Sequence, residues 1–199
     1  MSKIITISRE FGSGGRELGR CLAKKLGYAY YDKEIVREIA AKTKLSEDYV
    51  NSIVEKRPFS MFPIHTGSSF QTMTNPIDDQ NQLIFREQCN ILKQMADQSD
   101  CVIVGRCADY ILSEREPLRI FVYADMDYKI KRCLGNQSET ETLNSKEVKK
   151  KILSLDRQRA QYYMFFSGQK WGEKEFYDLC INMTNIEMDA AVASIAALI

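Results

Sequence analysis

A glycine-rich loop near the amino terminus holds the residues whose types and spacing most directly suggest chemistry. The loop reads Arg9-Glu-Phe-Gly-Ser-Gly-Gly15, with three glycines in four positions. Glycines let backbone N–H groups close on phosphate oxygens, and the amino terminus of a following helix adds positive potential. A tight structural turn is the alternative use of such glycines. We predict phosphate binding by the loop and the helix start, at Gly12, Ser13, Gly14, Gly15, Arg16 and Glu17.

One interpretation of the loop is the dinucleotide fingerprint G-x-G-x-x-G. Gly12 and Gly14 fit its first two glycines, but Glu17 stands where the third glycine belongs. Asp32, at the end of the next predicted strand, could still hold a ribose hydroxyl. This interpretation would make the protein a dinucleotide-dependent oxidoreductase.

The other interpretation is the P-loop, G-x-x-x-x-G-K-[ST], laid over residues 10–17. That alignment retains Gly15 and puts Glu10 at the first glycine, Arg16 at the lysine and Glu17 at the hydroxyl residue. Arginine is a different phosphate ligand from lysine, because its planar fork needs more room. Glu17 could bind Mg²⁺ through its oxygens or repel the phosphates that it faces. The loop alone leaves both interpretations open.

The elements that must position this loop alternate between strand and helix patterns. A β-branched run at 4–8 directly precedes the loop, and helical spacing of apolar residues at 18–26 follows it, with Gly27 as the stop. Further strands are predicted at 28–31, 101–104, 118–123 and 179–182. Further helices are predicted at 35–40 and 79–95. Three more are expected to start at the cap Ser46, within 138–151, and after a capping box formed by Thr184 and Glu187. This alternation favours an α/β fold with a parallel sheet covered on both faces.

The composition excludes several classes of function. Lys and Arg number 28 against 27 Asp and Glu, so the chain lacks the basic excess typical of nucleic-acid binders. No stretch approaches the ~20 apolar residues that cross a bilayer, and the amino-terminal apolar run is too short for a signal peptide. We therefore expect a cytoplasmic protein with no nucleic-acid or membrane partner.

The six cysteines indicate packed, reduced thiols. No two of them form a C-x-x-C pair, and the chain has one histidine, His65. This pattern does not fit the usual zinc sites. The sequence identifies no metal-binding residues beyond the suggestion at Glu17.

Residues 56–82 differ in composition from their surroundings. They contain three of the four prolines, and they also carry several apolar side chains: Phe59, Met61, Phe62 and Phe70. A solvated loop seldom contains so many apolar anchors. We expect a mobile loop, part of which packs over a substrate site or against a partner subunit in a homo-oligomer.

Three segments together resemble the cytidylate kinase-like family: Ser8–Gly19, Tyr30–Ile35 and Val102–Asp109. The resemblance continues through 156–163, 171–172 and 177–182, so it covers nearly the whole chain. It implies a single three-layer P-loop kinase-like domain over 1–199 with a five-stranded parallel sheet. It also implies a helical nucleotide-monophosphate cap at about 33–82 and a lid at about 152–172.

The resemblance also implies which residues bind the phosphate acceptor. Arg106 stands where cytidylate kinases hold the acceptor phosphate with an arginine, and Cys107 replaces the aspartate that follows there. Asp32 matches the aspartate that opens the acceptor-binding segment. Arg37 falls one residue short of that segment's arginine, and Arg86 lies where a further acceptor-side arginine is expected.

In the lid, the resemblance implies that cations close on the transferring group. Asp156 and Arg159 match the family's D-x-x-R pattern, and Arg157 lies between them, while Ile152 replaces an upstream arginine. Together with Arg16, the residues Asp156, Arg157 and Arg159 are the predicted catalytic set.

These residues suit phosphoryl transfer, which requires positioning and charge neutralisation more than covalent chemistry from the protein. The leading hypothesis is an ATP- and Mg²⁺-dependent kinase that acts on a small-molecule nucleoside monophosphate, with CMP or dCMP as first guess. The second hypothesis is a nucleotide-binding or sensing protein that keeps this fold but has lost turnover. The altered positions Glu10, Arg16 and Glu17 favour the second, while Arg106 and Asp156 favour the first.

Overall fold

A five-stranded sheet forms the centre of the computed structural model, which describes residues 3–54, 76–136 and 143–199. All strand pairs are parallel, in the order β2-β3-β1-β4-β5. The strands are β1 (Ile4–Arg9), β2 (Ala29–Tyr31), β3 (Cys101–Val104), β4 (Leu118–Tyr123) and β5 (Leu179–Asn182). The predicted five-stranded parallel sheet is confirmed, with every strand within one residue of its predicted bounds.

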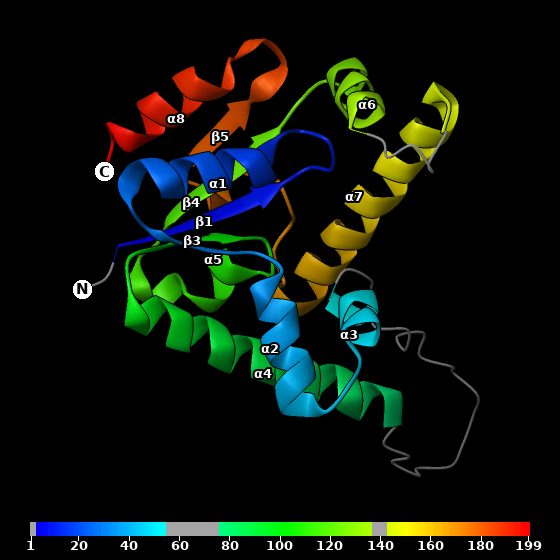
Figure 1. Cartoon of the computed structure of the whole chain (residues 1–199). Helices are drawn as coiled ribbons and strands as arrows, with labels where there is room; N and C mark the ends of the chain where they lie inside the picture. The colour runs from blue at the N-terminus through cyan, green and yellow to red at the C-terminus, as the bar shows by residue number, and fades with distance from the viewer. Residues whose placement is uncertain (1–2, 55–75, 137–142) are drawn as a thin grey trace.

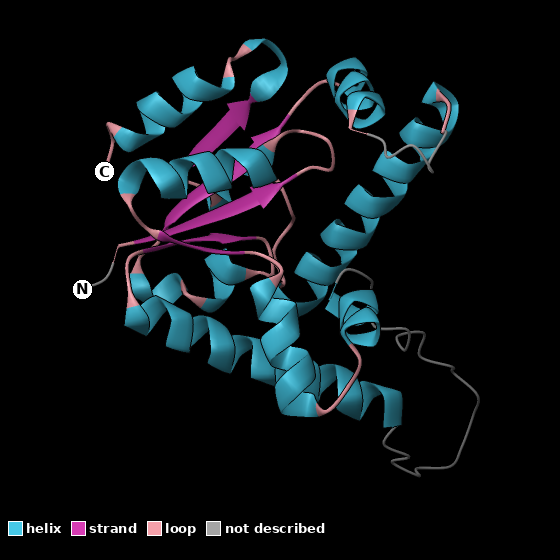
Figure 2. Cartoon of the chain, viewed as in Figure 1, coloured by secondary structure: helices cyan, strands magenta, loops and turns pink. Residues whose placement is uncertain are grey.

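Helices cover both faces of the sheet and make three layers (Figures 1 and 2). On one face lie α1 (Gly15–Leu26) and α8 (Met188–Ala196), which pack together. On the other lie α2 (Glu34–Thr43), α4 (Pro76–Gln98) and the short α5 (Ala108–Ile111), while α3 (Glu47–Val54) packs on α2 and α4. The pair α6 (Met126–Gly135) and α7 (Ser145–Ser167) lies beyond the carboxyl ends of the strands. Short 3-10 turns occupy Ser113–Arg115, Lys174–Phe176 and Met183–Asn185.

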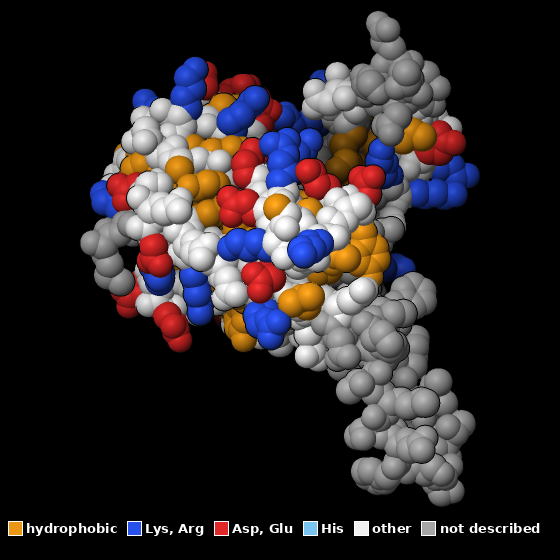
Figure 3. All heavy atoms as spheres, turned by 60° about the horizontal axis from the view of Figure 1, so that its bottom comes forward, with side chains coloured by type: hydrophobic (Ala, Val, Ile, Leu, Met, Phe, Trp, Pro, Cys, Tyr) orange, Lys and Arg blue, Asp and Glu red, His pale blue; other side chains and the backbone are white. Residues whose placement is uncertain are grey.

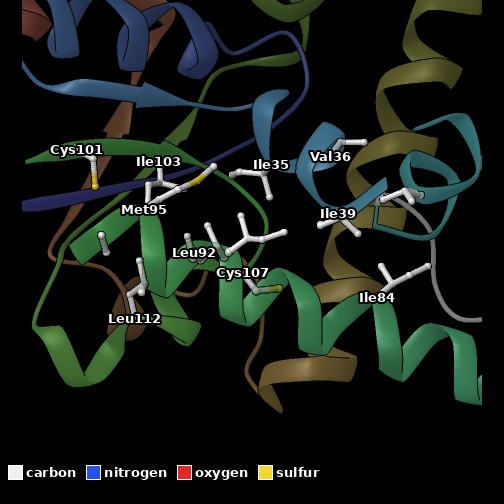
Figure 4. Close-up of a cluster of buried hydrophobic side chains, with 14 of the residues drawn as sticks. Ile35, Val36, Ile39, Ile84, Leu92, Met95, Cys101, Ile103, Cys107 and Leu112 are labelled. Atoms are coloured by element: carbon white, nitrogen blue, oxygen red, sulfur yellow. The ribbon is translucent and has the colours of Figure 1, made fainter. Parts of the chain in front are cut away.

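The strands direct alternate side chains into two apolar cores. Ile5 and Ile7 of β1 pack with Leu18 and Leu22 of α1 on one face. On the other face, apolar side chains from α2, α4 and β3 meet, as Figure 4 shows. Among them are Ile35, Ile39, Ile84, Leu92 and Ile103, each fully buried. The period-two alternation of a strand explains why neighbouring residues of one strand supply different cores.

Several helix ends agree with their local sequence, and one does not. Gly27 ends α1 in the left-handed conformation, as predicted, and the Ser46 hydroxyl accepts a hydrogen bond from the Tyr49 N–H (3.2 Å) at the start of α3. The predicted capping box at Thr184 is wrong. The Thr184 Oγ1 instead accepts from the Asp125 N–H (2.8 Å), and α8 begins after Glu187.

Parts of the predicted mobile loop and of the predicted lid lie in helices. Residues 76–82, which were expected in the mobile loop 56–82, form the first two turns of α4. The apolar anchors of that loop fall within 55–75, which lies outside the described residues. Residues 152–167 of the predicted lid belong to one uninterrupted helix, α7, which starts at Ser145. A capping box begins this helix. The Asn144 side chain accepts a hydrogen bond from the Glu147 N–H, and the Glu147 carboxylate accepts one from the Asn144 N–H.

The surface carries charges of both signs. On the face drawn in Figure 3, Lys and Arg side chains are interspersed with Asp and Glu. Within the described part of the chain, no helix is long and apolar enough to cross a membrane. All six cysteines are free thiols: Cys101 and Cys107 are buried, Cys21, Cys89 and Cys133 are half-buried, and Cys180 is exposed.

Candidate active site

A cavity of about 690 Å³, the main cavity, opens beside the glycine loop at the carboxyl ends of the strands. Open α/β sheets bind ligands in this position, because the loops that follow the strands converge there. Five of the six predicted loop residues line it: Gly12, Gly14, Gly15, Arg16 and Glu17. The sixth, Ser13, is fully buried and braces the loop by donating from its hydroxyl to the Glu10 carbonyl (2.9 Å).

The backbone of the loop requires its glycines. Gly12 and Gly14 have φ values of 81° and 91°, in the region that side chains disfavour. Helix α1 begins at Gly15, directly after the left-handed Gly14. A Cβ on Gly15 would lie 2.5 Å from the Arg9 Cβ, so this helix start packs directly on the end of β1. The result is a helix amino terminus open to the main cavity, the arrangement that binds phosphate.

Asp32 and Arg16 meet at one wall of the main cavity. The Arg16 Nε lies 2.7 Å from the Asp32 Oδ2, and the Arg16 side chain is 53% exposed, whereas Asp32 is buried. Glu34 supports the turn by accepting from the Asp32 N–H (3.1 Å). The two predicted residues are thus brought together, and in this structure Arg16 binds a carboxylate.

Arg9 is a functional candidate that the sequence analysis missed. It ends β1 and is 8% exposed, and the structure places its guanidinium against Gly105 and 4.0 Å from the Asp32 carboxylate. Burial, followed by the charges of Arg159 and Arg106, lowers its pKa to about 9. The sequence does contain a signal for Arg9, because a charged residue stands at the end of a buried, β-branched strand.

Arg106 lies in a strained turn after β3. Gly105, Arg106 and Cys107 have φ values of 74°, 63° and 52°, and two of the three carry side chains. Such strain persists only where its surroundings impose it, and it clusters at functional sites. Here the Gln88 side chain of α4 donates to the Arg106 carbonyl (2.9 Å), and the Tyr162 hydroxyl donates to Gln88 (3.4 Å).

A second, small cavity of about 40 Å³ lies at this turn. Its walls come from β1, the β3 turn, α7 and the loop after α7: Ser8, Arg9, Gly105, Arg106, Cys107, Arg159, Tyr162, Tyr163 and Trp171. Arg9 and Arg159 line both cavities. The space exceeds what one water molecule needs and suits a small anion.

Asp156 and Arg159, predicted to lie in a lid, reach the glycine loop from α7. The Asp156 Oδ1 accepts from the Phe11 N–H (2.7 Å), and the Arg159 Nη1 donates to the Arg9 carbonyl (3.1 Å). The Arg159 guanidinium also lies 5.6 Å from the centre of the Phe11 ring, within cation–π range. Burial raises the pKa of Asp156, against the opposing effects of the Phe11 N–H and the charges of Lys129 and Arg159.

Lys129 of α6 binds this part of the loop from a third side. Its buried ammonium lies 2.8 Å from the Glu10 Oε2 and 3.5 Å from the Asp156 Oδ2. The glycine loop, α6 and α7 are therefore joined by one cation between two carboxylates. Sequence analysis missed Lys129 because it did not predict α6.

Glu17 and three of the predicted arginines have other surroundings. Glu17 forms an ion pair with Arg132 of α6 at the rim of the main cavity. Arg37, Arg86 and Arg157 are exposed and line neither cavity, so the structure does not bring them to the site. Exposure of a helical side chain depends on how its helix packs, a property that position in a motif does not reveal.

The arrangement can bind a polyphosphate and neutralise its charge. Backbone N–H groups of a helix start, together with Arg9, Arg16, Arg106 and Arg159, surround the two cavities. No group of three or more metal-ligating side chains occurs among the described residues. A magnesium ion would therefore take most of its ligands from phosphates and water, which is its usual coordination in such sites.

Comparisons with known proteins give one family and several similar folds. The family profile that matches is that of the cytidylate kinase-like family, over residues 4–185. An uncharacterized protein from Eubacterium ventriosum ATCC 27560 has a similar structure, with TM-score 0.71, 28% identity and coverage of 99% of this chain and 98% of that one. Shikimate kinase from Bacteroides thetaiotaomicron gives TM-score 0.58 at 15% identity, with coverage of 98% and 97%. A sugar kinase from Janibacter sp. HTCC2649 gives 0.56 at 8%, with coverage of 99% and 94%. No curated protein matches by sequence.

Proposed function

The chain belongs to the cytidylate kinase-like family, and we propose that it transfers the γ-phosphoryl group of ATP to a nucleoside monophosphate, with CMP or dCMP as the first acceptor to test. The observation that carries this proposal is the pair of cavities that share Arg9 and Arg159 beside a helix amino terminus. The main cavity has room for a nucleotide, since ligand pockets of this kind span about 300–1,000 Å³.

In this proposal the glycine loop holds the donor. The N–H groups at the start of α1 bind the ATP phosphates, and Gly12 and Gly14 permit the turn that directs them inward. Mg²⁺, carried by the phosphates, would supply charge neutralisation there, and Glu17, which lines the main cavity, offers a carboxylate that could bind it.

Arg106 and Asp32 act on the acceptor side. The strained turn fixes Arg106 at the small cavity, where a guanidinium can bind a phosphate through two parallel hydrogen bonds. Arg159 approaches from α7 and neutralises charge on the transferring group. The acceptor phosphate already carries a deprotonated oxygen, so the site needs no general base.

The described parts of residues 33–82 and 152–172 fit a cap and a lid. Helices α2 and α3 would cover the acceptor, and α7, which contacts the glycine loop through Asp156 and Arg159, would cover the transferring group. We place the protein in the cytoplasm, and an association between copies through the 56–82 segment remains part of the proposal.

A second candidate function is nucleotide binding without turnover. It is favoured by the partners already present in the loop, because Asp156 accepts the Phe11 N–H and Arg132 binds Glu17. Both contacts occupy groups that a kinase would offer to the donor and its cation.

A phosphate-transfer assay separates the two candidates. Purified protein with Mg²⁺ and ATP is tested against a panel of nucleoside monophosphates, with Arg106→Ala as the site variant and Arg115→Ala, on the exposed turn after α5, as the matched control. A kinase shows turnover that falls about 100-fold in kcat/KM in Arg106→Ala and is unchanged in Arg115→Ala. Saturable ATP binding with no turnover on any acceptor supports the second candidate, and absence of ATP binding contradicts both.

A further inference from the structure

The first turn of α1 contains no lysine, and its one cation, Arg16, lines the main cavity while it binds Asp32. In P-loop proteins a lysine at this turn binds the β- and γ-phosphates. Here the turn begins with Gly15, which has no side chain, and Arg16 is bound to Asp32 through a 2.7 Å contact at the rim. A phosphoryl-transfer site without this lysine needs a positive charge from elsewhere.

Two glycines make room for Arg9 at the required place. Gly15 packs on the base of the Arg9 side chain, and Gly105 leaves the space for its tip: a Cβ on Gly105 would lie 1.9 Å from the Arg9 Nη1. These glycines come from the two loops that follow β1 and β3, neighbouring strands of the sheet. The guanidinium is thereby held between the glycine loop and Arg106, on the boundary of both cavities.

The electrostatics around Arg9 favour an anion. Arg159, Arg106 and Arg16 all disfavour its charge, and one carboxylate, that of Asp32, favours it from 4.0 Å. Arg16 shares the same carboxylate at shorter range. Burying a guanidinium among like charges costs free energy unless an anion compensates it, and a phosphate dianion at the boundary of the cavities would supply that compensation.

We propose that Arg9 is a catalytic residue that binds the transferring phosphoryl group, replacing from the end of β1 the lysine that the first turn of α1 lacks. The inference rests on the proposed function. An acceptor oxygen forms a bond to the γ-phosphorus as the bond from that phosphorus to the β,γ-bridging oxygen breaks, and ADP keeps the bonding pair. Arg9 neither gives nor takes a proton. Together with Arg159, its guanidinium neutralises the negative charge on the three equatorial oxygens of the transferring phosphoryl group.

The test compares ATP with ADP, which differ by the group that Arg9 is proposed to bind. Calorimetric titrations without acceptor measure both affinities in wild-type protein, Arg9→Met and Arg9→Lys, with Arg115→Met as the matched control. Loss of a charge-assisted hydrogen bond predicts at least a tenfold weaker affinity for ATP in Arg9→Met. The affinity for ADP is expected to change less than threefold, Arg9→Lys to fall between, and the control to match the wild type.

Thermal unfolding without ligand supplies the second readout. A functional Arg9 is an unfavourable buried charge, so ligand-free Arg9→Met is expected to unfold at the wild-type temperature or above it. Equal losses for ATP and ADP, unchanged ATP affinity, or a variant that fails to fold would each overturn the proposal and leave the proposed function standing. Wild-type protein that binds neither nucleotide would instead remove the proposed function, and this inference with it.

Discussion

The two edges of the sheet each hold an arginine beside an aspartate, and the two pairs differ in almost every physical respect. At the carboxyl edge, Arg9 is buried and lies 4.0 Å from Asp32, which Arg16 also binds. At the amino edge, Arg119 of β4 binds Asp178, directly before β5, with its Nη2 2.8 Å from Oδ1 and its Nε 3.1 Å from Oδ2. Both side chains of that pair are more than a third exposed.

Under the proposed function, the difference separates the edge that would bind a ligand from the edge that would not. Arg119 is partly exposed to solvent and has a complete bidentate partner, and this contact holds the pKa of Asp178 below its usual range. Arg9 has a distant, shared partner and little water, while other arginines crowd it. The amino edge therefore gains modest stability from its charges, whereas the carboxyl edge holds charges whose compensation would come from phosphate.

Lys129→Met would test the buried network of the carboxyl edge and should have the largest effect on stability. The change leaves Glu10 and Asp156 facing each other without their cation, and removing one partner of a buried ion pair costs about 3–5 kcal/mol. Chemical denaturation at pH 8 would measure the loss. A change below about 1 kcal/mol would mean that this network is as weak as a surface pair.

The effect of pH on Lys129→Met gives a sharper test. Burial already raises the pKa of Asp156, and loss of the Lys129 charge should raise it further. The folded state then takes up a proton more readily than the unfolded state. The penalty is therefore fully present above the folded-state pKa and shrinks as pH falls through it. A penalty that is constant from pH 8 to pH 5 would contradict this account.

Gly15→Ala would test how tightly the carboxyl edge is packed. The new Cβ would meet the Arg9 Cβ at 2.5 Å and the Val122 Cβ at 3.1 Å, and none of these atoms can move aside easily. We expect a loss of about 2 kcal/mol in the free energy of unfolding and weaker ATP binding. The matched control is Gly135→Ala at the end of α6, where nothing lies within 4 Å; its stability should stay equal or rise by up to about 1 kcal/mol. Equal effects in both variants would refute tight packing at Gly15.

Arg119→Met addresses the amino edge and should have the smallest effect. Exposed ion pairs contribute roughly 0–1 kcal/mol, because water screens them. Urea denaturation should show a loss within that range, and ATP affinity should stay at the wild-type value. A loss of ATP affinity would remove the contrast between the two edges.

The strands and the glycine loop could be predicted because their signals are local. The run Cys101–Val104 is apolar throughout, as a central parallel strand must be, and Gly12 and Gly14 occupy positions where the backbone takes positive φ. The beginning of α7 was predicted only coarsely. A helix start was expected within 138–151, and the capping box at Asn144 that fixes it at Ser145 was not recognised, because this polar stretch shows little helical periodicity.

The site was predictable only where a motif fixed it. Asp32, Arg106 and Arg159 were found by resemblance and line the cavities, but Arg37, Arg86 and Arg157 were named in the same way and lie exposed. Which way a helical side chain faces depends on how the helix packs, and a motif position does not contain that information.

The sequence by itself determined the parallel α/β sheet, the glycine loop and the helix start that follows β1, because apolar period and glycine conformation act over a few residues. The tertiary structure alone decided which charges meet. Lys129 lies 119 residues from Glu10, and the Phe11 N–H lies 145 residues from Asp156. Charges so far apart in the chain come within hydrogen-bond distance only once the sheet has brought its loops to one edge, and there burial makes their interactions strong.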